Sequence, residues 1–267
     1  MKLHPAFLYP LFIFSAAPAF AQVDTADIVV SKRNWAISVT PLLTQKNKIH
    51  GDRKPYNINS SNQWGIDVMI NYYSGLGDHF NLVYGAGVSF MAHNFAFSIP
   101  KDKFDPAEDQ DITVDGLLSR YFDLIDINAG LALQRTFNSN SYSKWVVEAG
   151  AVITLSPDTQ VSGTYTVSRT TGEEQEYLTT EDDYNNHGKP WFNFHVSAGK
   201  EWRLPWGHLV QTLVKLNYSP TKFFSGPYNF HVGNQPVQTG VYNMSGSYIG
   251  LTVSYILSRV KRVKVIR

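Results

Sequence analysis

The chain of 267 residues contains no cysteine, which excludes disulfide frameworks, thiolate metal sites and cysteine nucleophiles. Beyond its N-terminal stretch it also lacks any run of about 18 apolar residues, so no transmembrane helix is expected. Apolar residues do not recur at the 3.6-residue period of a helix over any useful length. These absences leave β-strands as the main predicted structure.

An excess of charge of one sign is missing too. The 23 Lys and Arg residues stand against 22 Asp and Glu residues and leave a net charge of +1, which argues against a general nucleic-acid binder. The charges are unevenly placed, however. Most charged residues at 100–119 and 157–190 are acidic, whereas 258–267 carries basic side chains and no acid.

The acidic stretches do not have the pattern of a metal site. Asp109, Asp111 and Asp115 lack the spacing of an EF-hand loop, because Val114 occupies the position that requires glycine. We therefore expect neither a metal nor a cofactor. The acidic stretches are interpreted as solvated surface, with weak divalent bridging to lipopolysaccharide phosphates as the alternative.

The N-terminus has the features of a secretory signal peptide. Lys2 precedes an apolar stretch at 6–17, which is too short to span a bilayer as a helix. Ala19 and Ala21 then offer the small side chains of a cleavage site. We predict that residues 1–21 are removed and that the mature chain is exported.

The remaining chain alternates between apolar and polar residues in eight segments, each near the length of about ten residues that a membrane-crossing strand needs. The segments are 34–44, 63–73, 80–99, 120–136, 144–156, 191–203, 208–219 and 247–257. The connectors alternate between long and short, with lengths of about 18, 6, 20, 7, 34, 4 and 27 residues. The predicted fold class is all-β: an antiparallel up-and-down transmembrane β-barrel of eight strands, with short periplasmic turns and long extracellular loops.

Alternation alone does not decide which face points outward, since a soluble lipocalin-type barrel has the same period with its apolar face inward. Two features favour an outward apolar face. The opposite face is rich in glycine, which relieves crowding in a narrow barrel, and carries five charged residues: Asp67, Asp126, Glu148, Glu201 and Lys215. All six tryptophans lie at predicted strand ends, as in an aromatic girdle at headgroup level: Trp35, Trp64, Trp145, Trp191, Trp202 and Trp206.

The charged inner face has two interpretations. The charges line an open lumen and set its ion preference, or they pair into a plug that only stabilises the barrel. The interior of an eight-stranded barrel is just wide enough for side chains, which favours the plug. Four acids against Lys215 leave an imbalance, for which Arg203 near the periplasmic rim is a candidate partner.

An enzymatic site is the weakest hypothesis. His195 and Ser197 share the inner face, and His93 also points inward. Same-face neighbours in one strand lie about 7 Å apart, too far for a direct hydrogen bond between a nucleophile and its base. No catalytic motif surrounds these residues, so lipid A modification is not expected and the chain is predicted to be non-enzymatic.

The mature chain is predicted to form one barrel domain at 22–257, followed by a basic periplasmic tail at 258–267. The long loops hold aromatic residues as well as charge, and 161–168 alternates like a hairpin arm above the membrane. Loops on a rigid scaffold often bind ligands, so a structural or surface-binding role is expected, with variable decoration as the alternative. The basic tail is expected to meet anionic headgroups or a periplasmic partner.

Two segments carry a resemblance to a known family. The segment 121–128, YFDLIDIN, followed by Gly130 and Leu131, is similar to the fourth-strand signature of the PorT-like "outer membrane protein beta-barrel domain" family, and 246–255 looks like that family's closing strand. In size and strand count the chain resembles the OmpA/OmpX-type barrels. The resemblance implies the outer membrane of a Gram-negative bacterium, contact with its lipids and lipopolysaccharide, and insertion by the barrel-assembly machinery.

Two further functions remain open. A narrow channel for small solutes or apolar molecules would use the charged inner face. An accessory role in a secretion machine would follow from the PorT-like resemblance.

Overall fold

The computed structural model describes residues 28–46, 48–51, 56–92, 95–104, 109–117, 125–138, 143–156, 161–168, 174–182, 190–232 and 235–262. The predicted signal peptide lies outside the described residues.

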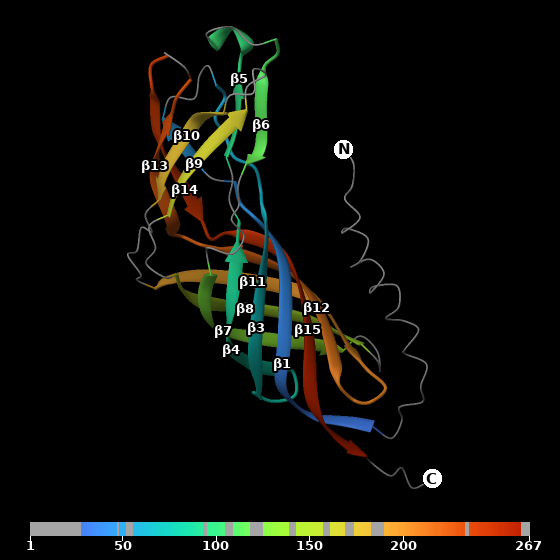
Figure 1. Ribbon diagram of the computed structural model, residues 1–267. Helices are drawn as coiled ribbons and strands as arrows, with labels where there is room; N and C mark the ends of the chain where they lie inside the picture. Colours follow the sequence, from blue (N-terminus) through green and yellow to red (C-terminus); the bar gives the residue numbers. More distant parts are fainter. Residues whose placement is uncertain are drawn as a thin grey trace.

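Eight strands form a closed antiparallel barrel in which each strand pairs with the next barrel strand along the chain (Figure 1). They are β1 (Ile28–Thr44), β3 (Trp64–Gly75), β4 (Phe80–Met91), β7 (Ile125–Asn138), β8 (Ser143–Leu155), β11 (Trp191–Arg203), β12 (Leu209–Tyr218) and β15 (Tyr248–Arg262). β1 pairs with both β3 and β15, which closes the barrel and leaves no free sheet edge. The predicted eight-stranded up-and-down barrel is confirmed.

Each predicted segment overlaps one barrel strand, with three differences. The segment predicted at 80–99 is divided, because β4 ends at Met91 and a separate strand, β5 (Phe95–Ile99), follows. β1 begins at Ile28, six residues before the predicted segment, and runs through Pro41 in unchanged register with the proline ring exposed. β15 continues to Arg262 and pairs there with Ile28, so the predicted boundary between barrel and tail at 257 is too early.

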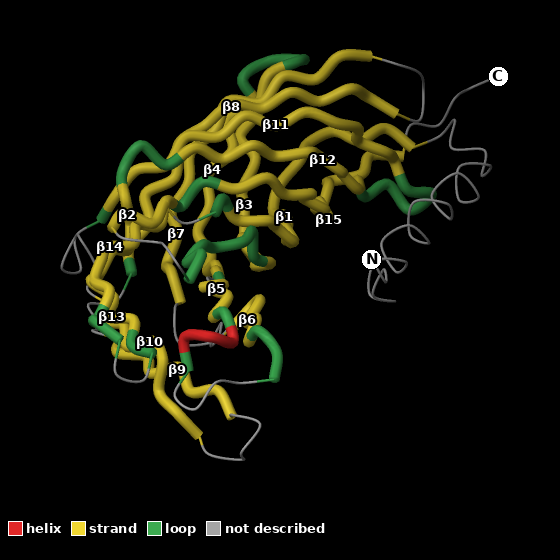
Figure 2. Tube along the Cα trace, turned by 90° about the horizontal axis from the view of Figure 1, so that it is seen from above, coloured by secondary structure: helices red, strands yellow, loops and turns green. Residues whose placement is uncertain are grey.

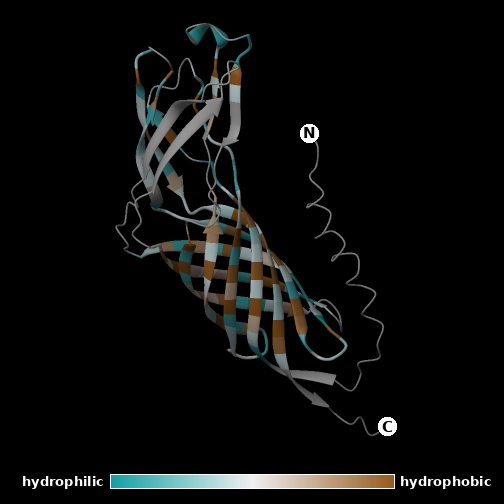
Figure 3. Ribbon diagram, in the orientation of Figure 1, coloured by the Kyte–Doolittle hydropathy of each residue, from teal (hydrophilic) through white to brown (hydrophobic). Residues whose placement is uncertain are grey.

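The two faces of the barrel differ sharply in polarity. On β11, Phe192 and Phe194 are 54% and 52% exposed on the outside, whereas Asn193 and His195 are 3% and 7% exposed inside. Figure 3 shows the resulting apolar stripes around the barrel. An apolar outer belt around a polar interior is the arrangement of a barrel that spans a membrane with its strands. Among the described residues, no helix has the length and apolar character needed to cross a membrane.

The two rims of the barrel are built differently. At one end, here called the turn rim, short connections at 76–79, 139–142 and 204–208 join the strands, and β1 and β15 extend beyond the barrel. Gly77 and Gly207 have φ angles of 109° and 91° in two of these turns, a backbone conformation that favours glycine. At the other end, here called the loop rim, four long connections leave the barrel.

The four long connections build a second β-structure above the loop rim, here called the outer subdomain. Its five-stranded sheet has the order β2 (Lys48–Gly51), β14 (Gln238–Ser245), β13 (Lys222–Phe230), β10 (Glu174–Asp182) and β9 (Val161–Ser168). The hairpin of β5 and β6 (Ile112–Leu117), with a short 3₁₀ turn at Lys101–Lys103, faces this sheet (Figure 2). The predicted hairpin arm at 161–168 is β9, which pairs with β10.

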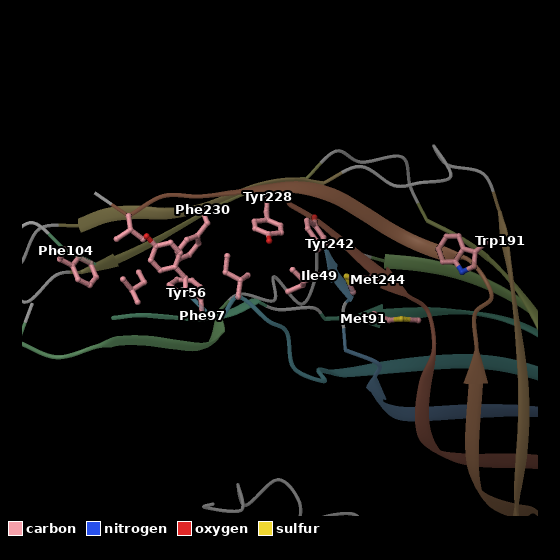
Figure 4. Close-up of a cluster of buried hydrophobic side chains, with 13 residues drawn as sticks. Ile49, Tyr56, Met91, Phe97, Phe104, Trp191, Tyr228, Phe230, Tyr242 and Met244 are labelled. Atoms are coloured by element: carbon pink, nitrogen blue, oxygen red, sulfur yellow. The ribbon is translucent and has the colours of Figure 1, made fainter. Parts of the chain in front are cut away.

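The outer subdomain has its own apolar core (Figure 4). The rings of Tyr56 and Phe97 pack against that of Phe230, with centroids 5.0 and 4.9 Å apart. The full cluster of buried residues is Ile49, Tyr56, Ile58, Met91, Phe97, Ile99, Phe104, Trp191, Tyr228, Phe230, Val232, Tyr242 and Met244. Beyond the predicted hairpin arm, the long loops therefore fold together around shared aromatic side chains.

We expect Phe230→Ala to destabilise the outer subdomain by about 3–5 kcal/mol, because it removes a fully buried ring and leaves a cavity. Limited proteolysis of the refolded protein should then cut the long connections faster, while the heat-modifiable gel mobility of the barrel stays unchanged. Val241→Ala, at a position that is 45% exposed on the same sheet, is the matched control. Equal protease resistance of the two variants would contradict the assigned core.

Candidate functional site: the barrel interior and the outer subdomain

An ion pair lies inside the barrel close to the turn rim. The Arg33 guanidinium donates through Nε and Nη2 to the two carboxylate oxygens of Glu201, over 3.1 and 2.7 Å. Gln211 Nε2 donates to the same carboxylate over 2.7 Å. Both charged side chains are largely buried, so this bidentate contact satisfies a carboxylate that would otherwise be unpaired inside the barrel.

Glu148 holds the middle of the interior. Its carboxylate accepts a hydrogen bond from Gln134 Nε2 over 2.9 Å and lies 3.3 Å from His195 Nε2. Gln134 and Gln211 also exchange reciprocal amide contacts of 3.3 and 3.4 Å, and Tyr73 donates its hydroxyl to Gln211 over 3.4 Å. The pair of glutamines therefore links Glu148 to the Arg33 contact below it.

A third group lies nearer the loop rim. Lys215 Nζ is 3.6 Å from Asp67 Oδ2, and Asn128 Nδ2 donates to Asp67 Oδ1 and to Ser89 Oγ, each over 3.1 Å. Asp126 accepts a hydrogen bond from Ser156. The structure thus places all five predicted charged residues on the inner face, each with a different set of partners.

Arg33 is the interior residue that the sequence did not indicate. Register shifts occur in β1 between Val30 and Lys32 and between Arg33 and Ala36. These irregularities break the alternation that assigns residues to faces, so the parity of the strand gives no signal that Arg33 points inward. The pairing of Arg33 with Glu201 reduces the imbalance for which the sequence suggested Arg203.

Side chains fill most of the interior. An apolar cluster of Ala36, Tyr73, Val83, Ala132, Leu209 and Ile256 occupies its turn-rim end. A cavity of about 50 Å³ remains beside Asp67, Glu148, His195 and Lys215, and a second of about 10 Å³ lies nearer the loop rim. Spaces of this size hold a few water molecules at most rather than a solute column, so the geometry favours a plug.

The His195 and Ser197 pair does not assemble into a nucleophilic site. His195 directs Nε2 toward Glu148, and neither its Nδ1 nor Ser197 Oγ has a hydrogen-bond partner among the described residues. A nucleophile needs a base within hydrogen-bond reach, which this pair lacks here. His93, the third candidate, lies outside the described residues.

The six tryptophans fall into three groups. Trp35, Trp145, Trp202 and Trp206 lie at the turn rim, where Trp35 packs edge-on against Tyr72 with ring centroids 5.1 Å apart. Trp64 lies at the loop rim and is 49% exposed. Trp191 does not belong to the predicted girdle, because it is only 3% exposed and packs in the core of the outer subdomain. Trp191 is two residues before Asn193 and therefore faces inward with it. This position in the alternation distinguishes Trp191 from the outward-facing tryptophans of the girdle.

The outer subdomain carries a surface pocket of about 370 Å³. It is lined by Tyr56, Lys103, Gln235, Pro236, Val237, Gln238 and Thr239. Burial raises the pKa of the Tyr56 hydroxyl above its usual range, so this group is a neutral hydrogen-bonding group at the pocket wall. The lining offers amide and hydroxyl groups, the Lys103 ammonium and the apolar surfaces of Pro236 and Val237 to a ligand.

The acidic residues of the second long connection serve local structure where they are described. Asp111 Oδ1 accepts a hydrogen bond from the Lys101 backbone N–H over 3.0 Å, and Asp102 forms a loose, exposed contact of 3.9 Å with Lys103. Within the described part of the chain, no three His, Cys, Asp or Glu residues gather as a metal site would require.

Comparison with known proteins adds little to this description. No family model and no curated protein matches the chain, so the PorT-like resemblance stays a prediction. The N-terminal β-barrel domain of OprF from Pseudomonas aeruginosa aligns with 8% identity over 85% of this chain and 100% of that one, at a TM-score of 0.33. Ail, the attachment invasion locus protein of Yersinia pestis, aligns with 9% identity over 85% and 100%, at 0.31. The transport unit of the autotransporter AIDA-I from Escherichia coli aligns with 9% identity over 98% and 100%, at 0.21. Similarity this low carries no functional argument, and the eight-stranded fold rests on the strand pairing of this chain.

We expect Glu201→Gln to destabilise the barrel by up to about 3–5 kcal/mol, because it leaves the Arg33 guanidinium without its carboxylate in a largely buried site. The urea concentration at which the heat-modifiable gel mobility is lost should fall. The double variant Arg33→Gln with Glu201→Gln should recover part of the loss. Asp102→Asn, which removes an exposed contact, is the control and should leave the midpoint unchanged. A Glu201→Gln midpoint equal to that control would show that the ion pair does not stabilise the barrel.

Proposed function

We propose that this chain is a non-enzymatic protein of the Gram-negative outer membrane, in which the barrel is an anchor and the outer subdomain binds a partner at the cell surface. The observation that carries the proposal is the core of the outer subdomain, to which three long connections contribute buried side chains. Loops without a task tolerate variation and seldom share a core. A rigid, folded platform above the membrane suits recognition.

The orientation follows from the two rims. Short turns of membrane barrels face the periplasm and long loops face outward, so the loop rim and the outer subdomain lie at the cell surface. The start of β1 and the end of β15, which pair with each other, then lie on the periplasmic side. Export through the predicted signal peptide and insertion by the barrel-assembly machinery agree with this orientation, as does contact of the outer belt with lipid and lipopolysaccharide.

The filled interior supports an anchor rather than a conduit. The Arg33 contact, the paired glutamines and the Asp67–Lys215 contact follow one another through the barrel. Because the larger remaining cavity is only about 50 Å³, passage of a solute would require these buried contacts to open. Binding at the surface needs no such rearrangement. The pocket beside Tyr56 and Val237 is a concave feature of the outer subdomain that a ligand could occupy.

A surface-binding role is tested with the refolded protein in nanodiscs, applied to arrays of glycans and extracellular proteins. We expect a reproducible ligand whose affinity falls at least about tenfold in Val237→Asp, which places a charge in the pocket. Val241→Asp makes the same change on the sheet face outside the pocket, at a similarly exposed position, and should bind normally. No ligand on either array, or equal losses in both variants, would count against the proposal.

The channel hypothesis is favoured by one observation, the water-sized cavity lined by Asp67, Glu148, His195 and Lys215. It is tested by single-channel recording in planar bilayers with protein shown to have inserted. The plug predicts no discrete conductance steps. Reproducible steps whose ion selectivity changes in Glu148→Gln would establish an open lumen and would replace the anchor in this proposal.

A further inference from the structure

A contiguous patch of aromatic and basic side chains lies on the lipid-facing side of the barrel near the turn rim. Phe80 on β4 pairs with Arg135 on β7, Phe137 on β7 pairs with Trp145 on β8, and Trp145 pairs with Lys200 on β11. These five residues, here called the cation patch, therefore cover four neighbouring strands. All but Lys200, which is partly exposed, are classed with the exposed residues of the outer face.

Both cations of the patch are held on aromatic rings. The Arg135 guanidinium lies 5.3 Å from the Phe80 ring centroid and 4.7 Å from that of Phe137. The Lys200 ammonium lies 4.7 Å from the Trp145 ring centroid. Such contacts fix a cation in place but leave its charge without a counter-ion. The two long side chains are thus ordered and still available to an anion.

The two cations of the patch have no anionic partner in the part of the chain that the structure describes. Among the described residues neither Arg135 nor Lys200 forms an ion pair, whereas the interior cations Arg33 and Lys215 each have a carboxylate partner. The connection 139–142 between β7 and β8 has the uncharged sequence Ser-Asn-Ser-Tyr. Glu148 and Glu201 lie on these strands but point into the barrel. Within the described part of the chain, neither cation therefore has a carboxylate as an ion-pair partner.

The depth of the patch limits what that anion is. A cation on the lipid face is tolerated at the membrane interface and is costly at the midplane, so the patch lies at headgroup level. The surrounding Trp35, Trp145 and Trp206 mark the same level, since tryptophan prefers the interface. At the loop rim the outer face instead ends in uncharged Trp64, Phe192 and Tyr218. The positive charge belongs to one leaflet.

A row of small side chains leads from the patch toward the middle of the bilayer. Above Trp145, β8 presents Val147, Ala149 and Ala151 on its outer face. Ala149 lies between Leu133 on β7 and Val196 on β11, which are bulkier, and Ala151 lies between Leu131 and Phe194. An acyl chain can lie along this row between its bulkier neighbours. Arg135 pairs with Val147 at the lower end of the row, and Lys200 pairs with Trp145 just below it.

We propose that the cation patch is a binding site for an anionic phospholipid of the turn-rim leaflet. Its phosphate lies between Arg135 and Lys200, and one acyl chain follows the β8 row. The backbone positions that carry the cations are two strands and two residues apart, about 12 Å at the usual strand spacing and rise, a gap that their long side chains and a headgroup fill. The inference rests on the membrane-spanning barrel of the proposed function and not on partner binding by the outer subdomain.

The test uses native mass spectrometry of the full-length mature protein in micelles that contain equal amounts of phosphatidylglycerol and phosphatidylcholine with the same acyl chains. Wild type should retain phosphatidylglycerol in preference to phosphatidylcholine. The double variant Arg135→Gln with Lys200→Gln should lose that preference by at least about tenfold. Raising NaCl from 0.1 to 1 M shortens the Debye length from about 10 to about 3 Å and should weaken it in wild type.

Two controls make the outcome decisive. The first control, Lys48→Gln with Lys222→Gln, removes the same amount of charge from exposed positions in the outer subdomain and should keep the preference for phosphatidylglycerol. The second, Lys200→Arg, keeps a positive charge at the patch and should also keep that preference. Equal retention of the two lipids by wild type, or equal losses in both double variants, would overturn the proposal, and the wild-type result stands even if a variant fails to fold. The glycan and protein arrays test binding by the outer subdomain, which is a different site. A negative result on those arrays would therefore not affect the lipid-binding result.

Discussion

Closure of the barrel is the constraint on which the rest of the structure depends. A bilayer offers no hydrogen-bond partners, so each strand must satisfy its backbone through its two neighbours. The pairing of β1 with β15 completes that circuit. Closure also locks the register, since a slip of one residue would exchange the lipid-facing and interior side chains of a whole strand. The paired charges inside, the aromatic rings outside and the platform above the loop rim all occupy positions that this register sets.

The interior shows how a narrow barrel accommodates acidic residues. Glu201 and Asp67 face opposite charges, Glu148 is shared by His195 and Gln134, and Asp126 has a hydroxyl partner. Glycine makes room for such side chains by leaving its own space to the neighbouring strand. A Cβ added at Gly87 would lie 2.0 Å from the Val68 carbonyl oxygen, a distance that only a backbone shift would relieve. The glycines and the charged residues of the inner face therefore pack together, because the glycines leave the space that the larger charged side chains occupy.

The sequence predicted the barrel well because lipid outside and polar groups inside impose a strict two-residue period on every strand. The period fails at Arg33, where the register shifts of β1 remove the parity that would have placed it inside. Composition misled at Trp191, which resembles a girdle residue but shares the inward parity of Asn193. The outer subdomain escaped prediction for another reason. Its sheet joins β2 to β14 and β10 to β13. These strands are far apart in the sequence, so local sequence patterns cannot predict that they pair.

In the orientation proposed above, that same sheet is the part of the protein that an immune system or a bacteriophage would meet. The exposed row of His50, Val241 and Pro227 comes from three strands of two different loops, and it exists only where those strands lie in register. An epitope on this face is discontinuous. A synthetic peptide copied from any single loop would lack the neighbouring strands, so antibodies raised against it would recognise the unfolded segment rather than the native surface. Antigenic drift in one loop is likewise limited by the strands with which it must still pair.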